Sequence, residues 1–579
     1  MMRTFTLLML LLSCGMLLAA ENLAPNPGFE TIKGEQPSDW SAPQAKGFAL
    51  TVSADDRHSG KTALRIAMNH DVAKDAHIEV QSVQFPVTAG NIYRLLGWYK
   101  STGWSGKGNI YSQTMVYFYD TAGNPVASRD GTQFDIPYAP TEAWRVAEMV
   151  TPAPAGAATA RINIRVHAYD ATVEKSPILY VDDYVVQSFQ VPETPKDARR
   201  WGYPARNYGV NAANDIIPDS RVGGAWHAKV GVTPAGGLIS GPMISEQGPG
   251  LYRVTYRMKV ADNTKADPVC TIYLASNGVL NTHSLRSRQI LANEFKQPNQ
   301  FEDFSMDFIR PPWGGMQYLC TWWGKVDLWL DTFTVTEVRR LPDHELVSFY
   351  GESSTGEVKP DRAGGLFVLR GPFYPLYRLD EVAAALGAKV TRVAHMATPG
   401  GNSVLNPPFP IDATELSGLR AVVLADVDAE ALTFQGRNAL RRFAEAGGTV
   451  LVLGGWVSYG EAKMEDTFLE EILPVTNPGA FDHERCTTPW PLTPAADWAQ
   501  GQGLPWKEAP VVLWMHRLTP KPGAKVLVTA GGKPFLVSAP CGKGQVIACA
   551  GTVLGKAPAG TNVFWNWSGW PQLLAKCLQ

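Results

Sequence analysis

The hydrophobic pattern of this chain changes its period near residue 360, and this change limits the folds that it can adopt. Before that point, apolar and polar residues alternate, as in "RINIRVHAYD", where Ile162, Ile164 and Val166 share one face. Such alternation is typical of half-buried strands. After that point, strands alternate with helical segments. The sequence therefore predicts β-sandwich regions followed by an α/β region.

The β region divides into two parts, 21–190 and 205–340, joined by the proline-rich linker "VPETPKDARRWGYP". "LYRVTYRMKV" follows "ISEQGPG" in the second part much as "NIYRLLGWYK" follows "VQFPVTAG" in the first. The two strand sets are offset by roughly 150 residues, which indicates a diverged repeat. We expect two β-sandwiches of the jelly-roll kind.

Residues 362–579 carry the pattern of a parallel sheet with helices on both faces. The expected strands are "GLFVLR", "KVTRVAH", "RAVVLADVD" and "TVLVLGG". The segment "QGRNALRRFAEAGG" is expected to be a helix that buries Leu440, Phe443 and Ala444 and ends at its glycine pair. Further strands, from "AKVLVTA" to "GQVIACAGT", suggest an antiparallel extension.

The charge balance of the chain gives no indication of a nucleic-acid-binding protein. The chain has 52 Lys+Arg against 54 Asp+Glu and no block of like charge, so nothing points to nucleic acid.

The N-terminal segment indicates export. Residues 1–20 are typical of an export signal, with Ala19–Ala20 as the cleavage site. The alternative is a lipoprotein anchored through Cys14 of "LLSC". No other window is long enough for a membrane span, so we expect a secreted or periplasmic protein.

Cysteine spacing gives no metal motif. The chain has seven cysteines, one of them Cys14, and the others are far apart, without CxxC spacing or a dense disulfide frame. Cys270 and Cys320 could form a bridge within one domain, or both could be buried free thiols.

The first sandwich carries a family resemblance at its two ends. "NLAPNPGFE" and "PSDW" at the start, with "LYVDDYVV" at the close, resemble the carbohydrate-binding-module jelly rolls of the family 4/9/16/22 type. The resemblance implies a poly- or oligosaccharide ligand. It also implies a structural calcium ion, held by the hard oxygen ligands of Glu30 and of Asp182 or Asp183.

Aromatic residues are the expected sugar contacts, because the apolar C–H faces of pyranose rings stack on exposed rings. Alternation places Trp98 and Tyr99 on opposite faces of one strand, so one of them is expected in the core. Arg165 and His167 are candidate polar partners. The candidate ligand-binding residues are Trp98, Tyr99, Trp104, Tyr111, Tyr117, Tyr119 and Trp144, together with Trp456 of the α/β region.

The α/β region resembles the class I glutamine amidotransferase-like, flavodoxin-like fold. The resemblance rests on "VVLADVDAEALTFQGRNALRRFAEAGGTVLVLGGWVSYG", "LEEILPV" and "GKPFLVSAPCGKGQVIACAG". A glutaminase of this fold needs a cysteine at a strand-to-helix elbow, with a histidine and a carboxylate. Here Trp456 is at the expected tip, and Ser458 does not match G-x-S-x-G. We therefore do not expect a glutaminase, and we expect Trp456 and Tyr459 to form an aromatic rim at the mouth of a cleft.

Other residues keep an enzyme open as an alternative. Cys486, His483 and Glu484 lie together in "FDHERC" as a weak nucleophile cluster, unless this is only a polar surface loop. Asp426, Asp428 and Glu430 follow a parallel strand, where ligands of open α/β sheets bind, so Asp426 could line a cleft. Alternatively, this acidic loop only caps the following helix. His516 is interpreted as a structural histidine.

Taken together, these patterns predict a secreted carbohydrate-binding or polysaccharide-processing accessory protein. One alternative is an extracellular hydrolase that acts on a glycan or an amide at the carboxyl ends of the parallel strands. A structural cell-envelope protein is the other alternative.

Overall fold

The computed structural model describes residues 21–69, 72–103, 110–136, 144–168, 177–244, 248–277, 283–312, 315–351, 356–397 and 403–579. The predicted export signal with Cys14, and the candidate ligand-binding residue Trp104, lie outside these residues. Contacts divide the chain into one unit that ends at Arg339 and a second unit that starts at Arg340. No helix in the part of the chain that the structure describes has the length and apolarity to span a membrane.

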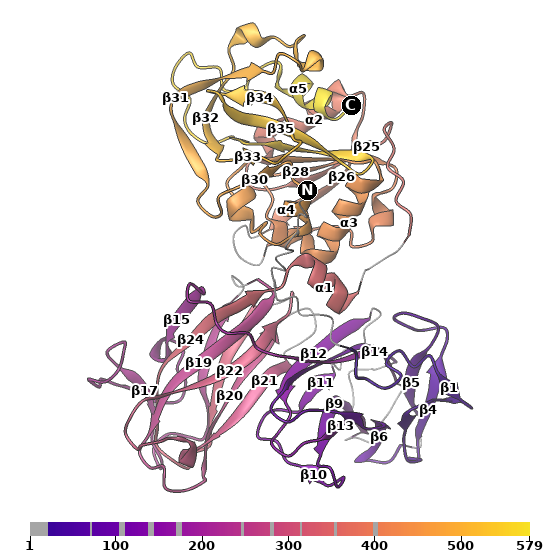
Figure 1. Cartoon of the computed structure of the whole chain (residues 1–579), viewed down its shortest axis with the longest axis vertical. Helices are drawn as coiled ribbons and strands as arrows, with labels where there is room; N and C mark the ends of the chain where they lie inside the picture. The colour runs from indigo at the N-terminus through magenta and orange to yellow at the C-terminus, as the bar shows by residue number, and fades with distance from the viewer. Residues whose placement is uncertain are drawn as a thin grey trace, which may run out of the picture. The chain divides into compact units, whose positions relative to one another are not determined.

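Two antiparallel sheets form the N-terminal sandwich (Figure 1). Ile162, Ile164 and Val166 are buried between them, as the alternation predicts. One sheet has the order β10-β9-β13-β6-β3 and the other the order β12-β8-β14-β5-β4. The strands are β1 (Ile32–Lys33), β2 (Gln36–Pro37), β3 (Trp40–Ser41), β4 (Phe48–Ser53), β5 (Ala63–Met68), β6 (Ala76–Ser82), β7 (Phe85–Pro86), β8 (Ile92–Thr102), β9 (Ile110–Tyr119), β10 (Pro125–Val126), β11 (Gln133–Ile136), β12 (Arg145–Pro152), β13 (Thr159–Ala168) and β14 (Ile178–Phe189).

The second sandwich repeats this strand order. Its sheets run β16-β17-β24-β19-β22 and β18-β23-β20-β21. Strands β22-β19-β24-β17 match β12-β8-β14-β5, and β20-β23-β18 match β9-β13-β6, so the predicted repeat is confirmed. The strands are β15 (Arg200–Pro204), β16 (Ala213–Asp215), β17 (Ala225–Ala228), β18 (Gly236–Ile244), β19 (Gly250–Val260), β20 (Pro268–Asn277), β21 (His283–Leu291), β22 (Glu302–Arg310), β23 (Gly315–Trp322) and β24 (Leu328–Arg340).

The structure settles the alternative that the sequence left open for the two cysteines of this sandwich. Cys270 and Cys320 are buried free thiols on the neighbouring strands β20 and β23. Trp322 is buried while Trp323 is 45% exposed, because neighbouring residues of a strand face opposite sides.

The C-terminal domain is built on one mixed sheet. Its parallel part runs β26-β25-β28-β29-β36, which is the chain order 2-1-3-4-5 of flavodoxin-like folds. The antiparallel extension continues from β36 through β35, β34, β31 and β32 to β37. The strands are β25 (Gly365–Arg370), β26 (Val390–Ala397), β27 (Val404–Asn406), β28 (Leu419–Ala425), β29 (Thr449–Leu453), β30 (Val475–Thr476), β31 (His483–Pro494), β32 (Val511–His516), β33 (Thr519–Pro520), β34 (Lys525–Ala530), β35 (Lys533–Cys541), β36 (Gly544–Cys549) and β37 (Gly551–Thr552).

Helices cover this sheet (Figure 1). Helix α3 packs against α1 and α4, and α2 packs against α5. Leu440, Phe443 and Ala444 of α3 are buried, and the helix ends at Gly447, as the sequence predicts. The helices are α1 (Asp343–Tyr350), α2 (Leu379–Ala385), α3 (Thr433–Ala446), α4 (Phe468–Ile472) and α5 (Trp570–Cys577).

A buried ion pair joins three of these helices. The Arg437 guanidinium of α3 donates two hydrogen bonds, of 2.7 and 2.6 Å, to the two carboxylate oxygens of Asp343 in α1. Asp343 also accepts the N–H of Phe468, the first residue of α4, at 2.9 Å. Both charged side chains are buried, so each depends on the other for its charge to be compensated.

Replacement of Arg437 by Met should destabilise the C-terminal domain by about 3–5 kcal/mol, because the Asp343 carboxylate would stay buried without its partner. The matched control is Lys359→Ala in the exposed pair with Glu357, which should cost less than about 1 kcal/mol. Urea unfolding measures both. Similar losses for the two variants would contradict the role of the buried pair.

Candidate functional site

The turn at residues 454–457 follows β29 at the carboxyl end of the parallel strands. It lies beside the ends of β25 and β28, where the strand order reverses and where open α/β sheets bind ligands. Backbones approach closely here, since a Cβ at Gly371 would lie 1.6 Å from the Asp426 carbonyl oxygen. At Gly455 it would lie 2.2 Å from the Asp426 carboxylate carbon. Glycine is therefore required at both positions.

Asp426 connects these chain segments. Its side chain is buried, and Oδ1 accepts the Val457 N–H at 2.7 Å. Oδ2 is buried with no hydrogen-bond partner among the described residues. Burial raises the pKa of the carboxyl to about 6, although the amides of Val457 and Phe373 act to lower it. The alternative that this acidic loop caps the following helical segment is met by Asp428, which accepts the Glu430 N–H at 2.8 Å, and not by Asp426.

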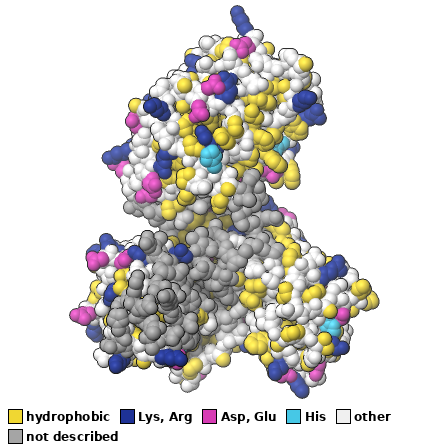
Figure 2. Space-filling model, turned by 180° about the vertical axis from the view of Figure 1, so that it is seen from behind, with side chains coloured by type: hydrophobic (Ala, Val, Ile, Leu, Met, Phe, Trp, Pro, Cys, Tyr) yellow, Lys and Arg dark blue, Asp and Glu magenta, His cyan; other side chains and the backbone are white. Residues whose placement is uncertain are grey.

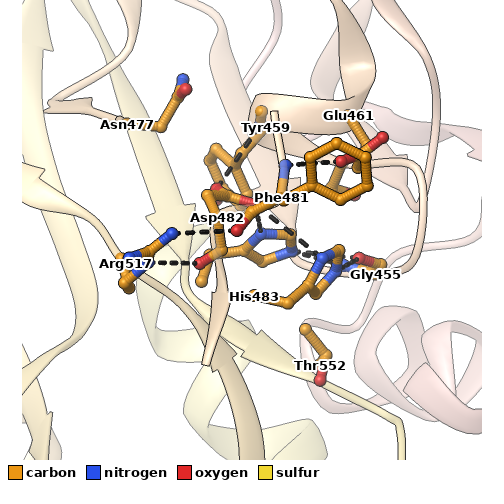
Figure 3. A network of polar contacts seen from close by, with 12 residues as sticks. Gly455, Tyr459, Glu461, Asn477, Phe481, Asp482, His483, Arg517 and Thr552 are labelled. Atoms are coloured by element: carbon orange, nitrogen blue, oxygen red, sulfur yellow. Dashed lines mark hydrogen bonds and ion pairs between the residues drawn. The ribbon is translucent and has the colours of Figure 1, made fainter. Parts of the chain in front are cut away.

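Two histidines and an aspartate surround the Gly455 backbone (Figure 3). His516 Nδ1 is 2.9 Å from Asp482 Oδ1, and its Nε2 is 3.2 Å from the Gly455 nitrogen and 3.0 Å from the Gly455 oxygen. His483 Nε2 is 2.9 Å from the same Gly455 oxygen. Burial lowers the pKa of His516, so the imidazole is neutral at pH 7. The imidazole is thus buried and held by its neighbours, and it contacts the turn itself.

Hydroxyl groups fix the rest of the turn. The Tyr377 hydroxyl donates to the Gly454 carbonyl oxygen. The buried Ser458 hydroxyl donates to the Leu453 carbonyl oxygen at 2.9 Å. The Tyr459 hydroxyl lies 2.9 Å from the Val452 carbonyl oxygen. Because Tyr459 is fully buried, it does not contribute to an aromatic rim, contrary to the expectation from sequence.

Trp456 is the exposed part of the turn, with 59% of its surface accessible. Its indole lies 6.5 Å from the Phe373 ring, between ring centroids. Phe481, which precedes Asp482, is 82% exposed. Figure 2 shows hydrophobic side chains gathered on one face of the C-terminal domain. The rim expected at this turn is therefore formed by Trp456 with Phe373.

The cluster predicted in "FDHERC" does not form one site. His483 faces Gly455, while the Glu484 carboxylate pairs with Lys533 at 2.6 Å. Cys486 packs into the hydrophobic core, and burial raises the pKa of its thiol to about 11. The three side chains point to different surroundings, since each belongs to a different part of the packing around β31.

The predicted aromatic residues of the first sandwich have different surroundings. Tyr99 is a core residue, and its hydroxyl bonds to Thr114 and Tyr184, so it is not offered to a ligand. Trp98 is half-buried and stacks on His58 with 3.9 Å between centroids, and Trp144 meets the same imidazole edge-on. The half-buried residues Tyr111, Tyr117 and Tyr119 lie along β9.

The acids expected to hold calcium lie around Gly28. A Cβ there would be 3.3 Å from Asp183 Oδ1 and 3.8 Å from Asp182 Oδ1. Burial, followed by the Asp183 charge, raises the pKa of Asp182 to about 7. The Glu30 carboxylate accepts the Lys61 N–H at 2.7 Å. The aspartate oxygens are already engaged, since Asp182 Oδ2 accepts the His58 N–H at 2.9 Å and Asp183 Oδ2 lies 2.6 Å from His58 Nδ1. Asp182, Asp183 and Glu30 would hold a calcium ion only after exchanging such contacts for the ion.

Sequence reasoning missed Asp482. It lies 34 residues before His516, and the two are brought together only by the pairing of β31 with β32. One signal in the sequence could have pointed to this pair. Strand β31 begins at His483, directly after Asp482, and strand β32 ends at His516. Strand ends on one sheet edge can meet, but the register was not deducible.

The buried Asp426 carboxyl should make the free energy of unfolding of the C-terminal domain depend on pH. Because its folded pKa is about 6 against an ordinary 3.8, the folded state holds the proton more tightly. Its stabilising effect is present below about pH 4 and lost as the pH rises through about 6, in total about 3 kcal/mol. Asp426→Asn should remove this component from urea unfolding curves measured across that range. A variant with the slope of the wild type would contradict the assignment.

We compared the chain with curated proteins, with solved structures and with protein families. No curated protein matches this chain. A cytoplasmic protein of Salmonella typhimurium LT2 is 18% identical at a TM-score of 0.29, over 37% of this chain and 97% of its own. The CBM22-1–CBM22-2 tandem domain of Xyn10C from Paenibacillus barcinonensis is 12% identical at a TM-score of 0.20, over 55% and 98%. TmCBM61, solved with β-1,4-galactotriose, is 17% identical at 0.21, over 29% and 100%.

The family comparison concerns the domain that carries the turn. Residues 380–579 match the family described as "Putative glutamine amidotransferase". This agrees with the flavodoxin-like strand order and with the resemblance seen in the sequence. The C-terminal domain is therefore glutamine amidotransferase-like.

Proposed function

We propose that this protein is a secreted carbohydrate-binding accessory protein, which binds poly- or oligosaccharide on its N-terminal sandwich. The observation that carries the proposal is the outer face of β9, β13 and β6. Tyr117 and Tyr119 lie on this face, half-buried, beside Arg161, Arg165 and Glu79 of the two neighbouring strands. Rings and charged hydrogen-bonding groups on one face are what a sugar needs for stacking and for its hydroxyls.

The polar groups of this face are held in place by one another. Arg165 Nε donates to Glu79 Oε1 at 2.7 Å, and Asn163 donates to Glu79 Oε2 at 3.0 Å. The Arg161 guanidinium donates to Gln81 at 2.7 Å and lies 5.7 Å from the centre of the Tyr119 ring. A ligand hydroxyl would meet groups whose orientation is already set, which lowers the entropic cost of binding.

Trp456 offers a second stacking surface in the C-terminal domain. Its exposed indole sits on a turn whose backbone is held by Asp426, His516 and Tyr377. A ring on a rigid support loses little freedom when a sugar stacks on it.

Binding by the full chain tests both surfaces. A glycan array, with β-1,4-galactotriose as a first soluble probe, identifies the ligand, and calorimetry then compares variants. Tyr119→Ala should weaken binding by about tenfold, which is about 1.4 kcal/mol and the upper range for one ring contact. The matched control is Trp323→Ala, which removes another exposed ring on the second sandwich. No bound saccharide, or an equal loss in the control, would overturn the proposal.

Trp456→Ala tests the second surface separately. If a saccharide also stacks on the turn, this variant should lower its affinity by about the same factor as Tyr119→Ala. Unchanged binding with Trp456→Ala and reduced binding with Tyr119→Ala would confine the site to the N-terminal sandwich.

A hydrolase acting on a glycan or an amide is the second candidate, and Asp426 favours it. This carboxyl is a candidate general acid, because it is buried, its pKa is raised and one of its oxygens has no hydrogen-bond partner among the described residues. It also lies where the strand order of the parallel sheet reverses. Product release from the bound saccharide, measured for the wild type and for Asp426→Asn, separates a hydrolase from a binding protein.

We also propose that the first sandwich binds a structural calcium ion. Adding Ca²⁺ to the chelator-treated chain should raise the unfolding temperature, because an ion held by Asp182 and Asp183 offsets their repulsion. At about a hundredfold excess over Kd the gain should be about 2.7 kcal/mol. Asp183→Asn should remove the effect, and Asp120→Asn, in an exposed turn, should keep it. The same calcium response in both variants would contradict this site.

A further inference from the structure

We propose that Asp482, His483 and His516 bind a divalent transition-metal ion of the zinc class beside the turn that follows β29. Among the described residues, these three side chains form the group in which one donor atom from each lies within 4.8 Å of the others. The inference goes beyond saccharide binding and does not depend on it. It rests on the register of two strands, on the donor atoms and on the contacts that orient the two imidazoles.

The ladder between β31 and β32 fixes the two histidines. His483 and His516 are directly paired across these antiparallel strands, and their rings lie 4.4 Å apart between centroids. Residues opposite each other in such a pair hold their side chains on one face of the sheet. Arg517 clamps the adjoining backbone, donating its N–H to the Asp482 carbonyl oxygen at 2.9 Å and Nη2 to the Phe481 carbonyl oxygen at 2.9 Å.

The donor atoms converge on Asp482 Oδ1. This oxygen is 2.9 Å from His516 Nδ1 and 3.9 Å from His483 Nδ1. In a tetrahedral site with metal–ligand bonds of about 2.1 Å, ligand atoms lie about 3.4 Å apart, so each of these two distances differs from that spacing by about half an ångström. The two imidazole donor atoms lie within 4.8 Å of each other, and they would move closer when the ion binds. The other carboxylate oxygen, Oδ2, is 3.4 Å from the Gly460 nitrogen.

The Gly455 carbonyl oxygen orients both rings. A carbonyl only accepts, so His483, with Nε2 2.9 Å away, carries its proton on Nε2 and turns an unprotonated Nδ1 toward Asp482. His516 Nε2 is 3.0 Å from the same oxygen. Metal-bound histidines commonly donate their second N–H to a backbone carbonyl in this way. Without metal, His516 keeps its proton on Nδ1 and donates to Asp482, while its Nε2 accepts the Gly455 N–H at 3.2 Å. Binding of the ion to Nδ1 would move this proton to Nε2, which would then donate to the Gly455 carbonyl oxygen in place of accepting the Gly455 N–H.

The ligand types and their burial select the metal. Two imidazoles and one carboxylate suit zinc, cobalt, nickel or copper better than calcium or magnesium, which prefer oxygen. Asp482 and His516 are fully buried, while His483 keeps 17% of its side chain exposed. Three protein ligands with one partly open side are typical of zinc sites that keep a fourth position for water or a ligand.

Cobalt spectroscopy on the full chain tests the site. The chelator-treated protein is titrated with Co²⁺ in excess Ca²⁺, which occupies all-oxygen sites, and Zn²⁺ is then added as a competitor. We expect one Co²⁺ per chain, with the intense visible bands of four-coordinate cobalt, and its displacement by Zn²⁺. No such spectrum in the folded wild-type protein would overturn the proposal.

His483→Asn is the principal variant, because its side chain is partly exposed and the fold should survive. Loss of one ligand should weaken Co²⁺ binding by at least about tenfold, the lower range known for loss of a supporting contact. The matched control is His344→Asn, an exposed histidine of α1 paired with Glu471, which should bind as the wild type does. Circular dichroism verifies folding of both variants. Equal affinity in His483→Asn and wild type would place the metal elsewhere and overturn the assignment.

Discussion

The close approach of Gly455 to the Asp426 carboxylate is the constraint on which this end of the C-terminal domain depends. A methyl group at residue 455 would overlap that carboxylate, so the turn after β29 packs directly on the residue after β28. Asp426 then accepts the Val457 N–H, while its second oxygen stays buried. Burying this carboxylate lowers the stability of the fold. Such unfavourable groups are typical of functional sites, where the geometry itself is needed.

The turn lies where a glutaminase of this fold has its nucleophile elbow, but its polar groups hold the backbone of the turn. In a glutaminase of this fold, a histidine must be free to take a proton from the nucleophile. Here His516 is fully buried and its Nε2 is in contact with the backbone of Gly455. The tip residue, Trp456, instead presents an exposed apolar ring. The same backbone therefore supports an exposed aromatic surface, for which we propose a binding role, because function resides in the site and not in the fold.

Much of the fold could be predicted from the sequence, because it depends on local periodicity. Alternation placed Ile162, Ile164 and Val166 in a core, and the change to a helical period located the α/β domain. The offset between the two strand sets predicted a repeat, and the two sandwiches do share their strand order. The acidic loop after β28 was expected to cap the following helix, and its residue Asp428 does so.

The site was less predictable, because it depends on register and on side-chain direction. His483 was singled out for the cysteine three residues away, whereas its partner in space is His516, across two paired strands. Tyr99 and Trp98 could be placed on opposite faces, but only the packing around Tyr184 shows which of them is inside. Tyr459 follows the turn in sequence and yet lies beneath it.

The central claim, that this turn is built for binding and not as an elbow that lacks only its nucleophile, is tested most directly by Trp456→Cys. The measurement is the rate of alkylation of the new thiol against pH, together with release of ammonia from glutamine. Because His516 is engaged with Gly455, the account predicts a thiol with an ordinary pKa of about 8.5 and no hydrolysis of glutamine. A thiolate that persists below about pH 7, together with glutaminase activity, would contradict it.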